Sequence, residues 1–381
     1  MRMAFVSISG VAWGGSEVLW VAVAKEALHQ GHQVMVSVFD WQPQHPTIQE
    51  LKTLGATFIY RRRFYPTFSK RLKKKIVNKF RIAGNKLTYH NYLNDFKADR
   101  ILFNLGGGDE IAQDNTDLMV FVKQTQIPFS VFYHSLSKQV LYADNIVENF
   151  RILFHKATSN FFTSKMQIDL MEKQLQYRFT NASIVHHPLR TIREFPLLLN
   201  KEDKIYFCII GSLVCRWKGQ DIVLKILAKE KWLSRNWVLN IYGEGEDEFI
   251  LKEIVKQSGI NERVFFYGFN NDIEKILKEN HLVLIPSKQD SGPIVLFEAM
   301  LAARPVVGSH IGAMPDYIVQ RETGVLAEGI SENDFEDALE TAWINRDKWV
   351  AWGRAGNRKI LAEYDFNSEK TLLKKFVDEQ Y

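Results

Sequence analysis

Residues 282–308 read LVLIPSKQDSGPIVLFEAMLAARPVVG, and this run contains the repeating unit of the whole chain. Its apolar ends, Leu282–Ile285 and Pro305–Gly308, predict two buried strands. Between them, Pro293 introduces the helical run Ile294–Ala302, because proline in the first turn of a helix gives up no hydrogen bond. A strand, a loop, a helix and another strand in this order indicate a parallel sheet covered by helices.

The same alternation continues outward in both directions. In the C-terminal half it predicts strands at Ile205–Ile210, Trp237–Tyr242 and Val264–Tyr267. In the N-terminal half it predicts strands at Met3–Ser9, Gln33–Phe39, Arg100–Leu105, Ser130–His134 and Phe161–Thr163. The sequence therefore predicts an α/β protein with two doubly wound, Rossmann-like domains that face a central cleft.

The alternation also suggests where the domains divide. We expect an N-terminal domain at 1–187, a linker at 188–203, a C-terminal domain at 204–364 and a final segment at 365–381. Ligands of open α/β sheets bind beyond the carboxyl ends of the strands, so the loops at those ends hold the candidate site residues.

The length and amino-acid composition of the chain exclude several classes of protein. A length of 381 residues suits two domains, and a hydrophobic fraction of 46% excludes a disordered chain. Cys208 and Cys215 on one extended strand would lie about 23 Å apart, too far for a disulfide, which predicts a cytoplasmic protein. The apolar run Met3–Val11 follows Arg2 as in a signal peptide, but Trp13 and two glycines come next, so we interpret it as a buried strand. No stretch has the roughly 20 apolar residues of a transmembrane helix.

One segment, 61–86, carries the positive charge. The chain has a net charge of +5, yet this segment has 11 Lys or Arg and no acid, whereas the rest has 38 basic and 44 acidic residues. As a helix it would place Leu72, Ile76 and Phe80 on one face and lysines on the other. Such a helix suits an anionic membrane surface or an anionic lipid-linked acceptor. The alternatives are a solvated helix that caps the first domain and a nucleic-acid patch. We favour the membrane or the lipid-linked acceptor and expect no nucleic-acid partner.

Two carboxylates flank the start of the helix at Ile294. Asp290 lies in the loop before this helix and Glu298 lies in its second turn. A helix N-terminus in a cleft offers free N–H groups and a positive dipole end, which suits a phosphate. Carboxylates beside the phosphate can accept hydrogen bonds from sugar hydroxyls. The alternative is that Asp290 only complements the helix dipole and Glu298 is solvated.

Other strand ends in this half carry glycines and basic residues. They are Gly211–Asp221 (GSLVCRWKGQD), Gly243–Gly245 (GEG), Arg263–Phe269 (RVFFYGF), Glu298–Val307 (EAMLAARPVV) and Gly312–Asp316 (GAMPD). In order and spacing the series resembles family 4 of the retaining glycosyltransferases over about Tyr206–Leu326. Weaker matches lie at Gly14–Glu17, Gly31–Val34 and Tyr133–Ser135. The resemblance implies the GT-B fold, with a last helix at Phe366–Tyr381 that crosses back onto the first domain.

The resemblance also implies a role for each matched residue. Glu298 would hold the ribose hydroxyls, Asp290 would hold hydroxyls of the transferred sugar, and Lys218 would neutralise the diphosphate. His134 would lie near the donor sugar, and the loop Gly14 and Gly15 would pass close to a phosphate or the acceptor. Further donor contacts are implied for Ser212, Arg216, Gly243, Gly292, Pro293, Ile294, Tyr267 and Phe269, of which the aromatic pair would bracket the base.

Two departures from the family pattern concern the donor. Where the family has an arginine after the first glycine, this chain has Ser212, and Arg216 in the same loop is the candidate replacement. The first acid is Asp290 rather than the commoner glutamate, so it reaches one methylene less far. Both changes leave the identity of the donor open.

The chemistry that the resemblance implies needs positive charge where the leaving phosphate becomes negative. Lys218, Arg216 and the helix start near Pro293 supply it, so we expect no metal ion and no cofactor. The sequence also has no Cys/His spacing typical of zinc. The family's retaining reaction implies attack on the same face of the sugar, assisted by the departing phosphate, so that Asp290 positions rather than attacks.

A lone histidine at the end of a strand usually has a structural role. The resemblance places His134 in the site, whereas we interpret His186 and His187 as structural. The acceptor is expected on the first domain, where Gly106–Glu110 follows a predicted strand.

The resulting hypothesis is a retaining glycosyltransferase that moves a sugar from a nucleotide-sugar, with UDP-sugar as the expected donor. Its acceptor would be a saccharide or lipid-linked saccharide in cell-surface polysaccharide synthesis, at the inner face of the plasma membrane. Three alternatives stand beside it. A nicotinamide-dependent dehydrogenase lacks its G-x-G-x-x-G fingerprint here, since the glycines fall at 10, 14 and 15. A non-catalytic basic membrane module leaves the C-terminal motifs unexplained. Another GT-B enzyme, such as a nucleotide-sugar epimerase, can be distinguished from a glycosyltransferase only by its products.

Overall fold

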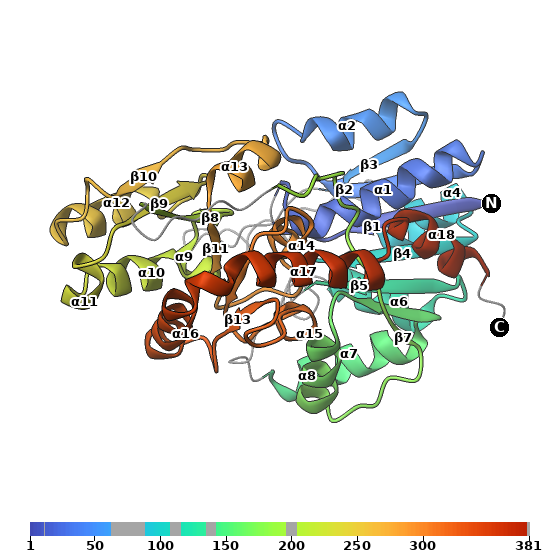
Figure 1. The fold of residues 1–381 in the computed structure, drawn as a ribbon. Coiled ribbons are helices and arrows are strands. Elements are labelled where there is room, and N and C mark those ends of the chain that lie inside the picture. The colour runs from blue at the N-terminus through green and yellow to red at the C-terminus, as the bar shows by residue number, and fades with distance from the viewer. Residues whose placement is uncertain (11, 62–87, 107–115, 135–141, 196–203, 379–381) are drawn as a thin grey trace, which may run out of the picture.

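The structure is a computed structural model of the chain, and it describes residues 1–10, 12–61, 88–106, 116–134, 142–195 and 204–378. The described residues form two parallel sheets, each covered by helices (Figure 1). The predicted α/β architecture with two Rossmann-like halves is therefore confirmed.

The first sheet has seven strands in the order β3-β2-β1-β4-β5-β6-β7. They are β1 (Arg2–Ser7), β2 (Gln33–Phe39), β3 (Thr57–Arg61), β4 (Arg100–Leu105), β5 (Phe129–Tyr133), β6 (Ser159–Phe162) and β7 (Ala182–Ile184). The helices around it are α1 (Gly15–His29), α2 (Pro46–Thr53), α4 (Tyr89–Phe96), α6 (Thr116–Gln124), α7 (Asp144–Lys156) and α8 (Lys165–Leu175). Successive residues of β1 serve opposite faces, since Ala4 and Val6 belong to one hydrophobic core and Phe5 to the other.

The second sheet has six strands in the order β10-β9-β8-β11-β12-β13. They are β8 (Ile205–Ile210), β9 (Trp237–Tyr242), β10 (Val264–Phe266), β11 (Leu282–Ile285), β12 (Val306–Gly308) and β13 (Gly324–Leu326). The helices are α9 (Cys215–Lys218), α10 (Gln220–Leu227), α11 (Glu230–Leu233), α12 (Glu248–Gln257), α13 (Ile273–Glu279), α14 (Ile294–Leu301), α15 (Met314–Tyr317), α16 (Glu332–Ile344), α17 (Trp349–Glu363) and α18 (Ser368–Asp378), with a short 3-10 turn η1 (Arg346–Lys348).

In each sheet the strand order reverses between two central strands. These are β1 and β4 in the first sheet and β8 and β11 in the second. Loops that leave neighbouring strands in opposite directions open a crevice at such a point, which is where ligands of these folds bind. We therefore expect a ligand site at the carboxyl ends of these four strands.

Every strand predicted from the sequence is present, with ends that differ by a few residues. Three strands were not predicted, namely β3, β7 and β13, and all three lie at a sheet edge. Edge strands have one neighbour and need less apolar surface. Four of the five residues of β3 are exposed or half-buried, and the other two strands are three residues long, so all three give a weak sequence signal.

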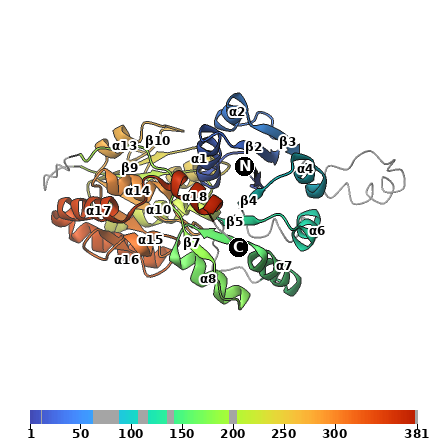
Figure 2. The same ribbon diagram turned by 90° about the vertical axis from the view of Figure 1, so that its right-hand side faces the viewer.

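The end of the chain returns to the first half. Figures 1 and 2 show α18 beside α1, although α17 covers the second sheet. Leu372, Leu373 and Phe376 of α18 are buried in the core that contains Phe5, and the rings of Phe5 and Phe376 are 5.9 Å apart. Burying apolar side chains of one half in the core of the other ties the two halves together.

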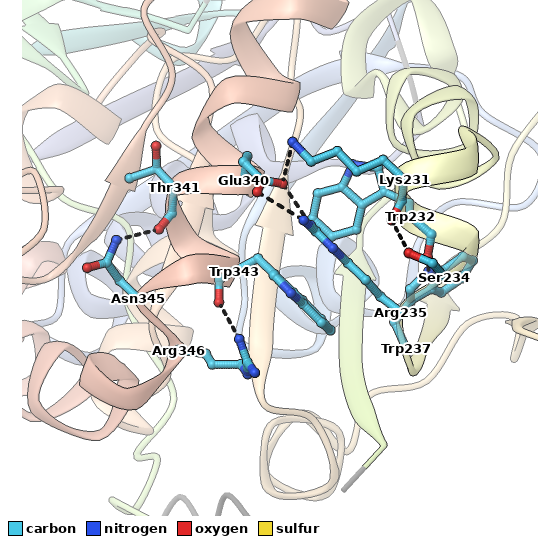
Figure 3. Close-up of polar contacts among 10 residues, drawn as sticks. All are labelled: Lys231, Trp232, Ser234, Arg235, Trp237, Glu340, Thr341, Trp343, Asn345 and Arg346. Carbon is cyan, nitrogen blue, oxygen red and sulfur yellow. Dashed lines mark hydrogen bonds and ion pairs between the residues drawn. The ribbon is translucent and has the colours of Figure 1, made fainter. Parts of the chain in front are cut away.

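A cluster of tryptophan and arginine side chains fixes α11 and the loop before β9 to α16 (Figure 3). The Arg235 guanidinium lies over the rings of Trp232, at 4.3 Å, and Trp343, at 5.1 Å. Its two terminal nitrogens donate to the carboxylate of Glu340 at 2.7 and 2.9 Å. This bidentate, stacked geometry is specific to arginine, and it accounts structurally for the aromatic content of this region.

Candidate active site

The loop before α14 is fixed between both halves of the molecule. A Cβ atom on Gly292 would lie 3.1 Å from the Thr163 side chain, which follows β6 of the first half. On the other side, a Cβ on Gly312 would lie 2.6 Å from the Asp290 carbonyl oxygen, and Gly312 has a φ of +61° that favours glycine. The loop and the Pro293 N-cap of α14 are thus held where the two halves meet.

Glu298 lies in the second turn of α14 and is 7% exposed. Its carboxylate has no hydrogen-bond partner among the residues that the structure describes. Burial raises the pKa of Glu298 to about 7, and the positive charge of Arg190 offsets part of this increase. A buried acceptor without a partner is costly, so a ligand that supplies hydroxyl donors would be favoured here.

Asp290 and Lys218 form an ion pair at the carboxyl end of β11. The Lys218 Nζ atom is 2.6 Å from Asp290 Oδ2, and the Ser287 hydroxyl donates to the same oxygen at 3.3 Å. Gly219 closes α9 with a φ of +65°, and a Cβ there would meet the Pro286 carbonyl oxygen at 2.1 Å. This close approach brings the two charges together across 72 residues of sequence.

Arg216 and Ser212 lie on the exposed side of the same loop. The Arg216 side chain is 64% exposed, pairs with Glu246 at 3.0 Å and lies over the Trp217 ring at 4.5 Å. Ser212 is exposed, and its carbonyl oxygen accepts a hydrogen bond from Gln220 at 2.8 Å. In the structure, therefore, both residues already have partners of their own.

Gly243 lies where the ends of β8 and β9 approach each other. Its φ is +136°, and a Cβ atom would lie 1.9 Å from the Gly211 carbonyl oxygen. A side chain cannot be accommodated at this position without moving one of the strand ends. The structure thus gives this glycine a packing role, whatever it contacts in a complex.

Tyr267 and Phe269 follow the edge strand β10 and are exposed by 54% and 72%. The Tyr267 ring is stacked on Tyr242 at 4.9 Å, and the Phe269 N–H donates to Glu244 at 3.4 Å. Two strands, β9 and β8, separate this edge from β11. Exposed aromatic rings at a strand end provide flat surfaces on which a planar group can stack.

On the first half, Gly14 is the N-cap of α1 and Gly15 is its first residue. No side chain caps this helix end, and no atom lies within 4 Å of where a Cβ on Gly15 would be. Of the stretch expected near the acceptor, Gly106–Glu110, residues 107–110 lie outside the described residues, as do residues 62–86 of the basic segment 61–86, whose first residue Arg61 is buried.

His134 follows β5 and is 8% exposed. Its Nε2 atom is 2.7 Å from the Asn104 side-chain oxygen, and its backbone N–H donates to Leu105. Burial holds the pKa of His134 well below its usual value, and nearby His187 adds to this effect. The imidazole is therefore neutral at physiological pH, and it is a hydrogen-bonding group rather than a cation.

Two groups next to His134 were missed by sequence reasoning. The first is the pair Glu17 and Asn104, which lie at 2% and 1% exposure behind the histidine. Asn104 Nδ2 donates to Glu17 Oε1 at 3.0 Å, so the carboxylate, the amide and the imidazole form a continuous chain. The available signals were the place of Glu17 in the weak family match at Gly14–Glu17 and the position of Asn104 near the end of a predicted strand.

The second is His187, which the sequence analysis interpreted as structural together with His186. The ring of His187 is stacked 5.8 Å from His134, and burial lowers its pKa to about 4 although the charge of Asp290 opposes this shift. His187 thus lies between the site residues of the two halves. His186 instead joins the halves, because it bonds to the Tyr317 hydroxyl and to the Asp365 N–H, each at 3.0 Å.

The described residues contain neither a candidate metal site nor a candidate membrane-spanning helix. No three His, Cys, Asp or Glu side chains in this part of the chain are grouped so that they could hold a metal ion. None of its helices is both long enough and apolar enough to cross a membrane.

Comparison with known proteins identifies the fold and the class. Residues 191–359 match the family model described as glycosyl transferases group 1. The chain is 22% identical to lipopolysaccharide glucosyltransferase WaaG of Escherichia coli, over 92% of each chain. It is 32% identical to N-acetyl-alpha-D-glucosaminyl L-malate synthase of Bacillus anthracis, over 33% of this chain and 36% of that one.

Among solved structures, HepE of Anabaena in complex with UDP superposes with a TM-score of 0.75 at 15% identity, over the full length of both chains. A mutant of TarM from Staphylococcus aureus, in a complex that includes UDP, superposes with a TM-score of 0.68 at 15% identity, over 99% of this chain and 100% of that one. The two facing Rossmann-like halves are thus those of the GT-B fold. The chain is a glycosyltransferase with the GT-B fold, and its residues 191–359 are similar to the group 1 glycosyl transferases.

Proposed function

We propose that the protein is a retaining glycosyltransferase that transfers a sugar from a UDP-sugar to a saccharide or lipid-linked saccharide acceptor during cell-surface polysaccharide synthesis. The observation that carries this proposal is the buried carboxylate of Glu298 beside the N-terminus of α14, without a partner in the described residues. A nucleoside diphosphate supplies the two groups that this arrangement lacks, a diol for the carboxylate and phosphates for the helix N-terminus. The solved relatives with bound UDP support uracil as the base.

The donor would be held by three side chains of the second half. Glu298 would accept hydrogen bonds from the ribose hydroxyls. The ion pair of Lys218 and Asp290 would open, with the ammonium group turning to the diphosphate and the carboxylate to the hydroxyls of the sugar. Both charged groups already lie at the carboxyl end of β11, so positive charge would be present where the leaving group becomes negative.

The other site residues would complete the donor site. Tyr267 and Phe269 would bracket the base with their exposed rings. Ser212, Gly292, Pro293 and Ile294 would border the phosphates, and Gly14 and Gly15 would approach a phosphate or the acceptor. Arg216 would add the charge that the family's arginine supplies, after release from Glu246.

Retention of configuration would follow from attack on the same face that the diphosphate leaves. The bond from the anomeric carbon to the phosphate oxygen breaks, and the acceptor oxygen forms the new bond to that carbon. The acceptor's proton passes to the departing phosphate oxygen, so no side-chain nucleophile and no metal ion is needed. Neutral His134 would hold a hydroxyl of the substrate in place. Full activity in EDTA is the expected result.

A screen of UDP-, GDP- and ADP-sugars tests the donor. We expect UDP-sugars alone to raise the melting temperature and to be hydrolysed slowly without acceptor, and Glu298→Gln to abolish the shift. Proton NMR of the product reports the anomeric configuration and separates transfer from epimerisation. A GDP- or ADP-sugar preference would overturn the UDP assignment, and an inverted product would overturn retention.

The protein would act as a peripheral protein at the inner face of the plasma membrane, through the basic segment 61–86. The charge of that segment and the name of the relative WaaG, which acts on lipopolysaccharide, support this placement. Sedimentation with anionic liposomes at low salt tests it. We expect binding that is lost when Lys73, Lys74 and Lys75 are changed to Gln, whereas neutral liposomes should not bind. Failure of the unchanged protein to bind anionic liposomes would rule the idea out.

A further inference from the structure

Glu17 is a buried carboxylate at the switch point of the first sheet, and it contacts no cation in the described residues. Its Oε1 atom accepts from the Ser7 hydroxyl and from Asn104 Nδ2, each at 3.0 Å, and its Oε2 atom accepts from the Trp20 indole N–H at 2.9 Å. The Ser16 hydroxyl adds a longer contact of 3.4 Å. Such a group is expensive to bury, so a role beyond packing is expected.

The hydrogen bonds of Glu17 determine which way the Asn104 amide faces. Because an ionised carboxylate only accepts, Asn104 must direct its NH2 group to Glu17 and its oxygen to His134. The oxygen in turn requires a proton on His134 Nε2. The second ring nitrogen, Nδ1, then carries a lone pair and has no partner among the described residues.

We propose that Glu17 and Asn104 are positioning residues, which hold His134 in the tautomer with the proton on Nε2 so that Nδ1 accepts a hydrogen bond from a substrate hydroxyl. The inference rests on the proposed site role of His134 and adds the reason for its orientation. Glu17 lies on α1, Asn104 on β4 and His134 after β5, so the chain of bonds runs from the helix across the sheet to the site.

Trp20 makes the arrangement sensitive to the state of the carboxyl group. Its N–H can only donate, so Oε2 must stay an acceptor, and a proton on the carboxyl group has to lie on Oε1. Protonation of Oε1 removes the negative charge to which the Asn104 NH2 group and the Ser7 hydroxyl donate, and so weakens the constraint on the amide. Burial raises the pKa of Glu17 to about 7, so this protonation occurs in the neutral range.

Among the described residues, three other charged or titratable groups lie near this chain of bonds, namely Arg61, His187 and Asp290. Arg61 contacts the Ser7 backbone rather than Glu17, and His187 faces His134 with its pKa lowered to about 4. Asp290 acts on His187 from the other half. Glu17 is therefore the group that sets the tautomer near neutral pH, and kcat should rise with pH around 7.

The substitution Glu17→Gln tests the proposal because it reverses the constraint. The new amide must offer its oxygen to Trp20, so its NH2 group faces Asn104. The Asn104 amide then turns over and donates to His134 Nε2, which moves the imidazole proton to Nδ1. Nitrogen NMR of histidine-labelled protein distinguishes the two tautomers without any substrate. We expect the Nε2–H tautomer in the unchanged protein and the Nδ1–H tautomer in Glu17→Gln.

Activity gives the second readout. Glu17→Gln should lower kcat at least about ten-fold with the KM for the donor within two-fold, and should remove the rise of kcat with pH. Adding Asn104→Asp should restore the Nε2–H tautomer and part of kcat, because a carboxylate there accepts from both neighbours. The matched control is Ser16→Ala, which removes only the contact at 3.4 Å and should leave the tautomer and kcat unchanged.

Three results would contradict the proposal: an unchanged tautomer in Glu17→Gln, an inverted tautomer with normal kcat, or no rescue by Asn104→Asp. A normal rate in His134→Ala together with the expected tautomers would instead refute only the proposed role of His134. The NMR readout therefore separates failure of the positioning chain from failure of the proposed function.

Discussion

The two halves of the molecule each bury a glutamate near the strand ends, and the two carboxylates have different surroundings. Glu17 in the first half accepts hydrogen bonds from side chains on β1, α1 and β4. Glu298 in the second half has no such partner in the part of the chain that the structure describes. Burial raises the pKa of both to about 7.

The difference separates two uses of a buried acid. The protein itself provides the hydrogen-bond donors of Glu17, so this residue shapes its surroundings. No described residue donates a hydrogen bond to Glu298, and under the proposed function a ligand would supply those donors. Judged by burial and raised pKa alone, Glu17 and Glu298 would be assigned the same role.

The largest effect is expected for Lys218→Ala, which removes a charge from the second half where the leaving group would form. We expect kcat to fall by about 100-fold, the usual effect of losing one preorganised charge at a reacting centre. The folding of the variant, checked by circular dichroism, should be unchanged. Lys225→Ala is the matched control, because this exposed lysine of α10 pairs with Asp221 at 3.4 Å. Equal rates in both variants would remove Lys218 from the site.

Glu298→Gln should lower turnover at least about ten-fold, since an amide accepts fewer hydrogen bonds from the ribose than a carboxylate. Isothermal titration with UDP should show a matching loss of affinity. A variant with the affinity and the rate of the unchanged protein would show that the unpartnered carboxylate is not a ligand-binding group.

The stability of the protein without ligand should respond to Glu298→Gln in the opposite direction. A pKa raised from 4.5 to about 7 means that the folded state binds more protons than the unfolded state between these values. Stability therefore falls as pH rises through this window, by at most about 3 kcal/mol for this group. At pH 8 we expect the variant to melt higher than the unchanged protein in a calorimetric scan.

Glu340→Gln is the control with the opposite sign. Hydrogen bonds from Arg235 lower the pKa of Glu340, so its charge stabilises the folded state above the unfolded pKa. This variant should melt lower at pH 8. If both variants shifted in the same direction, the contrast between a paired and an unpaired carboxylate would be wrong.

The smallest effect concerns the connection between the halves. The Tyr364 hydroxyl donates to the His187 carbonyl oxygen at 2.7 Å in a buried contact. Tyr364→Phe leaves that oxygen without this donor and should destabilise the protein by about 1 kcal/mol. Denaturant unfolding measures the change, and Tyr206→Phe on the exposed part of β8 should show none. A neutral result for Tyr364→Phe would mean that the connection is made by apolar packing alone.

The sequence by itself determined the architecture and one side of the site. Strand and helix periodicities are local, so the alternating pattern predicted the central strands of both sheets. The order of the motifs in the second half predicted the group 1 domain, and the loop at Asp290 with α14 lies within one continuous segment. Edge strands such as β3 and β13 were not predicted, because a strand at the edge of a sheet needs few apolar residues.

Only the tertiary structure decided how side chains from distant segments meet. Asn104 and Glu17 are 87 residues apart, and the parallel pairing of β1 with β4 brings them within hydrogen-bond distance. His187 comes next to His134 through stacking that no local pattern encodes. The physical reason is that residue type and spacing specify an element, whereas strand order specifies its neighbours. The neighbouring elements therefore decide that Glu17 has hydrogen-bond donors from the protein and that Glu298 has none among the described residues.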